Sequence, residues 1–133
     1  MINWDNHAKI SLAATVLRNT GVVAYPTEAV WGLGCDPWSE AAVQRILQLK
    51  GRAESKGLIL IADHSRHFAP FLLGLDKDQL TVFEGSYDKP VTWLVPHNGV
   101  APGWIVGEHD TLALRVTTHP LAAALCGAFG GPL

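Results

Sequence analysis

The stretch YPTEAVWGLGCDP, residues 25–37, combines two aromatic side chains, a Thr-Glu pair and two glycines directly after a short apolar run. That run, VVAY (22–25), is typical of a buried strand. Because glycine has no Cβ, Gly32 and Gly34 let the backbone come close either to another segment or to a ligand. The stretch therefore predicts a strand followed by a close backbone approach, and the pattern leaves both partners open.

Outward from this stretch, apolar spacing predicts alternating helices and strands. Helices are expected around residues 10–17, over 40–50, after Asp63 or Ser65, after Asp76 and from Pro120 to 129; strands are expected over 22–25, 58–62, 91–95 and 111–116. Ser39 is a candidate N-cap, and Asp76 with Gln79 resembles a capping box. Since the elements alternate without a regular βαβ rhythm, we expect a single α/β domain with a twisted mixed sheet flanked by helices.

The expected strand TLALRV (111–116) contains an arginine among apolar residues. Alternation directs the two leucines and Val116 to one face and Arg115 to the other. Arginine is rarely buried without a partner, so Arg115 needs a structural carboxylate or a bound anion on its face.

The composition is that of one globular domain: 133 residues, of which 48% are hydrophobic and 17% charged. With 10 Lys and Arg against 12 Asp and Glu, the formal charge of −2 provides no overall attraction to nucleic acid or anionic lipid. The sequence begins without a signal-peptide pattern, and no window reaches the ~18 apolar residues of a membrane helix. We expect a cytoplasmic protein without membrane contact.

Cysteine and histidine give no metal-ligand spacing, since Cys35, Cys126 and the six histidines are scattered. We therefore expect reduced, buried thiols and assign no metal ligand. His64 and His67, one helical turn apart, are expected at the surface.

Three cations, Lys50, Arg52 and Lys56, lie between a predicted helix end and a predicted strand. As a solvated turn they would only complement the negative end of the helix dipole. As a site they would clamp a phosphate, since Arg offers a planar fork of donors and Lys a mobile charge. Thr27 and Glu28 also have two interpretations. Thr27 could cap the turn and Glu28 could be a solvated carboxylate, or both could belong to a ligand site. No G-x-x-x-x-G-K-[ST] pattern is present, which excludes a P-loop.

Five motifs follow one another along the chain: YPTEAVWGLGCDP (25–37), LKGRAESKGLILIA (49–62), PVTWLVP (90–96), LALRVTTHPLAAALC (112–126) and GGPL (130–133). Together they resemble the YrdC-like threonylcarbamoyl-adenylate synthases, from about Ile10 to Leu133. The resemblance implies a YrdC-like fold, in which the strand and turn of the first motif line a concave sheet surface that holds threonine and ATP. It therefore favours a ligand as the partner of that stretch.

The activity implied by this resemblance is that of a nucleotidyltransferase. It condenses L-threonine, bicarbonate and ATP to threonylcarbamoyl-AMP and pyrophosphate, the first step toward threonylcarbamoyladenosine in tRNA. ATP is then a substrate, with Mg²⁺ as its companion ion. The implied partners are tRNA and the proteins of the tRNA threonylcarbamoylation pathway.

The resemblance also implies residue roles. Lys50 and Arg52 would be the catalytic residues that neutralise the triphosphate, and Thr92 would bind the phosphate region of the nucleotide. Threonine would contact Thr27, Lys56 and Arg115. The Arg115 guanidinium would pair bidentately with its carboxylate. Glu28 lies in the same motif without an assigned role.

Two departures from the family pattern are present. Asp88-Lys89-Pro90 stands where the family has Pro-Gly-Pro, and the family continues past Leu133 into a strand and a Ser-Thr-Ser-Ala-Asn motif. The resemblance thus predicts a single domain, residues 1–133, that is incomplete at its C-terminus. Two alternatives to the synthase follow: an inactive fragment that retains the fold, and a double-stranded RNA-binding or ribosome-maturation module whose basic residues contact phosphate.

Overall fold

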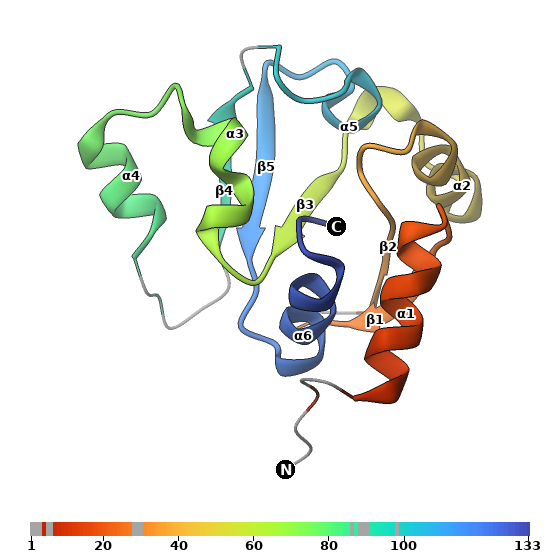
Figure 1. The fold of residues 1–133 in the computed structure, drawn as a ribbon. Coiled ribbons are helices and arrows are strands. Elements are labelled where there is room, and N and C mark those ends of the chain that lie inside the picture. Colours follow the sequence, from red (N-terminus) through yellow and green to blue (C-terminus); the bar gives the residue numbers. More distant parts are fainter. Residues whose placement is uncertain (1–3, 5–6, 28–30, 86, 88–90, 98) are drawn as a thin grey trace.

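The strands form two sheets in the computed structural model, which describes residues 4, 7–27, 31–85, 87, 91–97 and 99–133 (Figure 1). In the first, β1 (Val23–Pro26) pairs antiparallel with β2 (Trp31–Gly34). In the second, β5 (Thr111–Val116) lies between β3 (Ile59–Ala62), to which it is parallel, and β4 (Thr92–Pro96), to which it is antiparallel. This mixed arrangement with flanking helices confirms the α/β class expected from the sequence.

The central strand β5 follows the predicted alternation. Leu112 and Leu114 are 1% and 0% exposed in the core, and Arg115 therefore lies on the opposite face. The strand that stabilises the sheet also positions a charged side chain.

Three longer helices confirm the prediction; two have the predicted bounds, and the first extends beyond residues 10–17 at both ends. They are α1 (Ala8–Arg18), α2 (Glu40–Lys50) and α6 (Pro120–Phe129). The Ser39 side chain accepts the N–H of Ala42 at 3.3 Å and so caps α2. At the other end of α2, Gly51 adopts φ +61°, a left-handed conformation that suits glycine.

The helix expected after Asp63 or Ser65 is instead two short pieces, η2 (Ser65–Phe68) and α3 (Ala69–Leu72). Pro70 lies in the first turn of α3 and has no N–H to continue the preceding hydrogen bonds. The apolar spacing is therefore right, but the continuous helix is wrong.

Neither of the two expected caps of this region is used. The His64 ring accepts the N–H of Arg66 at 3.0 Å, while the Asp63 carboxylate lies 3.0 Å from Nε2 of His67. His64 is exposed as expected. His67 is only partly exposed, since 17% of its side chain is accessible beside Asp63.

Sequence patterns miss β2 and α5 (Gly103–Val106). Two of the four residues of β2 are glycine, which has low strand propensity, and α5 is a single turn, too short to show a helical period. The strands expected from residues 22, 58 and 91 begin one residue later, at Val23, Ile59 and Thr92.

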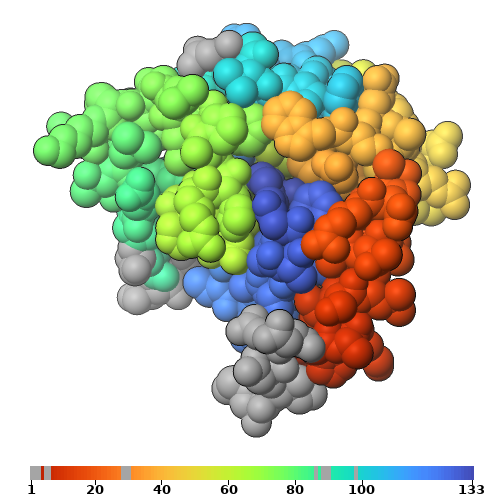
Figure 2. All heavy atoms as spheres, in the orientation of Figure 1, coloured from red at the N-terminus to blue at the C-terminus, as the bar shows by residue number. Residues whose placement is uncertain are grey.

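Buried side chains form two groups. The larger joins α2, α3, α5 and the three-stranded sheet, and the smaller joins α1, α6 and β1. Figure 1 shows α3 and α6 on the same side of that sheet. In Figure 2 this side is filled, with the blue α6 segment packed between the red α1 and the yellow-green residues around η2 and α3.

The capping box of α4 (Lys77–Phe83) gives a first test of the local structure. Asp76 Oδ1 accepts the N–H of Gln79 at 2.8 Å, and Gln79 Oε1 accepts the N–H of Asp76 at 2.9 Å. Because the side-chain acceptor is lost and the reciprocal box is broken, Asp76→Ala is expected to lower the free energy of unfolding by about 1 kcal/mol in a urea titration. Asp78→Ala, in the same first turn but outside the box, is the control; an equal loss would mean that capping is not the cause.

Candidate functional site

Lys50, Arg52 and Lys56 lie on one exposed loop between α2 and β3, residues 50–57, which we call the cation loop. It contains the short helix η1 (Glu54–Lys56). The Arg52 side chain folds back across the loop, and its Nε and Nη2 donate to the carbonyl oxygen of Gly57 at 3.1 and 2.9 Å. The structure thus brings together the three cations that the sequence singles out.

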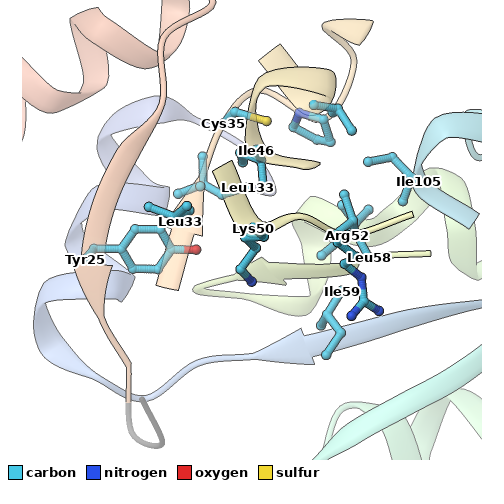
Figure 3. Close-up of a pocket in the computed structure, with 14 residues that line it drawn as sticks. Tyr25, Leu33, Cys35, Ile46, Lys50, Arg52, Leu58, Ile59, Ile105 and Leu133 are labelled. Carbon is cyan, nitrogen blue, oxygen red and sulfur yellow. The ribbon is translucent and has the colours of Figure 1, made fainter. Parts of the chain in front are cut away.

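Two adjoining cavities flank the cation loop. The first, of about 200 Å³, is lined by Lys50 and Tyr25 among others, and the second, of about 220 Å³, by Lys56 and His109. Arg52 lines both cavities, as do the apolar side chains Leu58, Ile59 and Ile105. In Figure 3 the side chains of Lys50 and Tyr25 turn their polar ends toward the interior of the first cavity.

The titratable groups buried in and around the first cavity are uncharged at neutral pH. Burial, with smaller effects of Cys126 and Cys35, raises the pKa of the Tyr25 phenol far above its usual value. Burial and then Asp36 raise the pKa of the Cys35 thiol to about 12. Burial and then Asp63 raise the pKa of Cys126 to about 12 as well. Both thiols are buried, free and protonated, so neither is a nucleophile, and the expectation of buried thiols is confirmed.

Arg115 lies on the sheet face that contributes to the second cavity. Leu94 and Ala113 form a cross-strand pair on this face and line the cavity, and the next pair on the same face is Thr92 and Arg115. Residues two apart on a strand are roughly 7 Å apart. Nε of Arg115 donates to Oγ1 of Thr92 at 3.0 Å, which fixes the orientation of the guanidinium.

Thr27 and the strand of Arg115 do not share a sheet, contrary to the expectation that both strands belong to one. Among the described residues, β1 pairs with β2, the strand formed by the glycine-containing residues 31–34. β5 belongs to the separate three-stranded sheet. Thr27 is half-buried just after β1, and the described lining of the two cavities does not include it. Glu28 and Asp88-Lys89-Pro90 lie outside the described residues.

The glycines after β1 have different surroundings. A Cβ on Gly34 would lie 2.5 Å from the Tyr25 ring, whereas one on Gly32 would meet nothing within 4 Å. At Gly34 the close approach is therefore to the aromatic side chain of β1, while the same glycine also lines the first cavity.

Sequence reasoning misses Tyr25 and His109 as cavity residues. In the sequence Tyr25 looks like an ordinary buried strand residue. In the structure it is 5% exposed and lines the first cavity. His109 is one of six scattered histidines, yet its Nε2 lies 2.9 Å from the Lys56 carbonyl oxygen, 53 residues away. A contact over this separation leaves no local pattern in the sequence.

Two carboxylate residues belong to the segments that form this site: Glu54 in the cation loop and Glu108, whose N–H donates to the Ser55 carbonyl. Across the part of the chain that the structure describes, no group of three or more His, Cys, Asp or Glu side chains is placed to hold a metal ion. Mg²⁺ commonly binds through substrate phosphates and water with only one or two carboxylates. In the same described residues, no helix has the length and apolar character needed to cross a membrane.

The arrangement as a whole is suited to anions. The cation loop provides three positive charges beside two cavities with apolar walls, and Arg115 adds a fourth on the adjoining sheet face. Charge-assisted hydrogen bonds from Lys and Arg are strong where apolar surroundings exclude water. The positive charges therefore favour anionic ligands at the cation loop and on the adjoining sheet face.

Comparison with protein families and curated sequences gives concordant results. Residues 15–133 match the Sua5–YciO–YrdC family model, described as telomere recombination. The chain is 52% identical over 133 residues to the threonylcarbamoyl-AMP synthase of Cellvibrio japonicus, an alignment that covers 100% of this chain and 70% of that relative. It is 55% identical over 125 residues to the enzyme of the same name from Halorhodospira halophila, covering 94% of this chain and 65% of the relative.

Solved structures show the same architecture. P. abyssi Sua5 complexed with L-threonine superposes with a TM-score of 0.84 at 31% identity, over 93% of this chain and 36% of that protein. E. coli YciO superposes with a TM-score of 0.80 at 24% identity, over 96% of this chain and 63% of its own, and supports the fold alone. The chain spans little more than a third of the Sua5 protein.

Proposed function

Because the chain belongs to the Sua5–YciO–YrdC family, we propose that it acts as an L-threonylcarbamoyladenylate synthase, condensing L-threonine, bicarbonate and ATP. Relatives at 52% and 55% identity carry this enzyme name, and the related Sua5 has been solved with L-threonine. The observation in this structure that carries the proposal is the cation loop between two cavities, next to the face of Arg115.

The chemistry depends on charge neutralisation more than on acid–base groups. The threonine amine and bicarbonate give a carbamate and water. A carbamate oxygen then bonds to the α-phosphorus while the bond to the bridging oxygen breaks and pyrophosphate leaves with that electron pair. Positive groups that stabilise the departing pyrophosphate lower the barrier.

Lys50 and Arg52 are our candidates for this stabilisation. Both line the first cavity, and Lys50 directs its side chain into it (Figure 3). Arg52 uses Nε and Nη2 on the Gly57 carbonyl, which leaves the Nη1 amino group for a phosphate oxygen. Mg²⁺ bound to the triphosphate would share this neutralisation.

Threonine is assigned to the sheet face and the second cavity. Arg115 would bind its carboxylate through two parallel hydrogen bonds, with Lys56 as a further contact. Thr27, which follows β1 and does not line the described cavities, would have to contact threonine from outside them. Thr92, assigned to the phosphate region of the nucleotide, accepts a hydrogen bond from Arg115. This bond would connect the amino-acid and nucleotide subsites. A cytoplasmic location, tRNA as the final acceptor and protein partners of the pathway belong to the same proposal.

The threonine assignment predicts a selective effect of Arg115→Lys. Lysine keeps the charge but cannot reproduce the planar fork. We therefore expect threonine affinity to fall about tenfold or more, which is about 1.4 kcal/mol, while ATP affinity changes little. Calorimetric titration with each ligand measures both effects.

Arg66→Lys, an exposed arginine of η2, is the matched control and should bind threonine as the wild type does. Unchanged threonine affinity in Arg115→Lys would remove the amino-acid pocket from this face. Loss of both affinities together with the thermal transition would instead indicate that Arg115 pairs with a protein carboxylate.

The synthase is tested by pyrophosphate release from ATP, which should require both threonine and bicarbonate. Binding of ATP and threonine without release would support the inactive-fragment alternative. The RNA-binding alternative predicts tight binding of duplex RNA that weakens steeply with salt, with no release. The net charge of −2 and the synthase name of the relatives favour pyrophosphate release that requires threonine and bicarbonate.

A further inference from the structure

The end of α5 and the residues that follow it, 105–109, are hydrogen-bonded at three points to the cation loop and to Leu58, the residue after it. We call this stretch the brace segment. Its bonds run from Leu58 N–H to the Ile105 carbonyl at 2.8 Å, from Glu108 N–H to the Ser55 carbonyl at 3.0 Å, and between His109 Nε2 and the Lys56 carbonyl at 2.9 Å. Because a carbonyl oxygen only accepts, His109 carries a proton on Nε2 and donates it.

Two glycines allow this close contact. Gly107 has φ +63°, and a Cβ there would lie 2.4 Å from the Ser55 carbonyl oxygen and 2.6 Å from that of Glu54. Gly57 has φ +74°, and a Cβ there would lie 2.9 Å from the Val106 carbonyl oxygen. At both positions a side chain would meet backbone atoms, which cannot swing aside as a side chain can. The two segments therefore hold each other in conformations that glycine alone adopts readily.

The brace reaches the anion-binding groups through two successive carbonyls. His109 holds the carbonyl of Lys56, and the next carbonyl, that of Gly57, accepts both hydrogen bonds from Arg52. A shift of the backbone at Lys56 and Gly57 would therefore move the Arg52 guanidinium and the Cα of Lys56 together. His109 and Lys56 also line the same cavity, next to Arg52.

We propose that Gly107 and His109 are positioning residues, which hold the cation loop in the geometry that presents Arg52 to an anion and Lys56 to the adjoining second cavity. Neither residue needs to touch the ligand for this role. The inference rests on the proposed function for the identity of the anion, the triphosphate of ATP. The bracing itself depends only on the contacts between the two segments.

The test compares two substitutions of one histidine, using inorganic triphosphate as the probe. His109→Leu removes the donor, and its triphosphate affinity is expected to fall about fivefold, as for one lost hydrogen bond. His109→Gln can place an N–H near the position of Nε2 and should restore most of the affinity. His64→Leu is the control, an exposed histidine whose ring accepts a hydrogen bond from the backbone of η2, away from the cation loop.

Hydrogen exchange of backbone amides provides a readout that does not require a ligand. The amides of Leu58 and Glu108 bond across the contact, so they should exchange several-fold faster in His109→Leu than in the wild type, whereas the capped amide of Ala42 should not change. Gly107→Ala should have a larger effect on both readouts and should also lower the melting temperature, because its Cβ meets backbone.

The outcomes separate the bracing from the proposed function. Weaker triphosphate binding and faster exchange in His109→Leu, both reversed in His109→Gln, would support positioning. Wild-type affinity in His109→Leu would overturn it, as would unchanged exchange at Leu58 and Glu108. If the wild-type protein binds no triphosphate, the proposed function fails, and the exchange rates alone decide whether the brace exists.

Discussion

Replacing Lys50 by alanine is expected to weaken ATP binding by about 1.5–3 kcal/mol, the range for a hydrogen bond to a charged group. Lys50 is the last residue of α2, and its side chain faces the first cavity beside Tyr25 (Figure 3). With the ammonium removed, a triphosphate in this cavity would lose one of its nearest positive charges. Calorimetric titration with ATP measures the change.

Lys9→Ala is the matched control for this variant, since Lys9 is an exposed helical lysine of α1 and the net charge changes equally. Its ATP affinity should equal that of the wild type. If Lys50→Ala also binds ATP normally, the cation loop is a solvated turn that complements the end of α2, and the phosphate assignment is wrong.

Leu114→Ala should destabilise the protein severely. Leu114 is 0% exposed at the middle of β5 and packs in the larger core. Removing its buried methyl groups leaves a cavity between the sheet and the helices, so the free energy of unfolding should fall by about 2–5 kcal/mol. Urea unfolding followed by circular dichroism gives the value.

The control is Leu94→Ala on the neighbouring strand β4, where the leucine is 68% exposed on the other face. It should change the free energy of unfolding by no more than about 0.5 kcal/mol, as is usual for surface positions. Equal losses at Leu94 and Leu114 would contradict the two-faced description of this sheet.

The fold was predictable where local physical rules act alone. The capping oxygen of Ser39, the reciprocal box of Asp76 and Gln79, and the alternation of TLALRV each fix an element through residues near in sequence. The pairing of β1 with β2 was not predictable. Two of the four residues of β2 are glycine, and Gly34 packs against the Tyr25 ring of β1. The break between η2 and α3 shows that one proline outweighs a regular apolar spacing.

The candidate site was predictable to the extent that its residues are close in sequence. Lys50, Arg52 and Lys56 are within seven residues, and the chain could hardly separate them. The contact of His109 with Lys56 crosses 53 residues, and the bond from Arg115 to Thr92 depends on the register of β4 with β5. Such contacts follow from tertiary packing, which single-sequence patterns do not encode.

A heteronuclear NMR titration of the backbone amides tests the central claim most directly, namely that nucleotide and threonine occupy adjoining subsites on the cation loop and the sheet. We predict that ATP shifts the amides of Lys50 and Arg52, and that threonine shifts those of Arg115 and Lys56. Both ligands should leave the amides of α4 unchanged. Saturating ATP and threonine that leave the cation loop and β5 unshifted would contradict the claim.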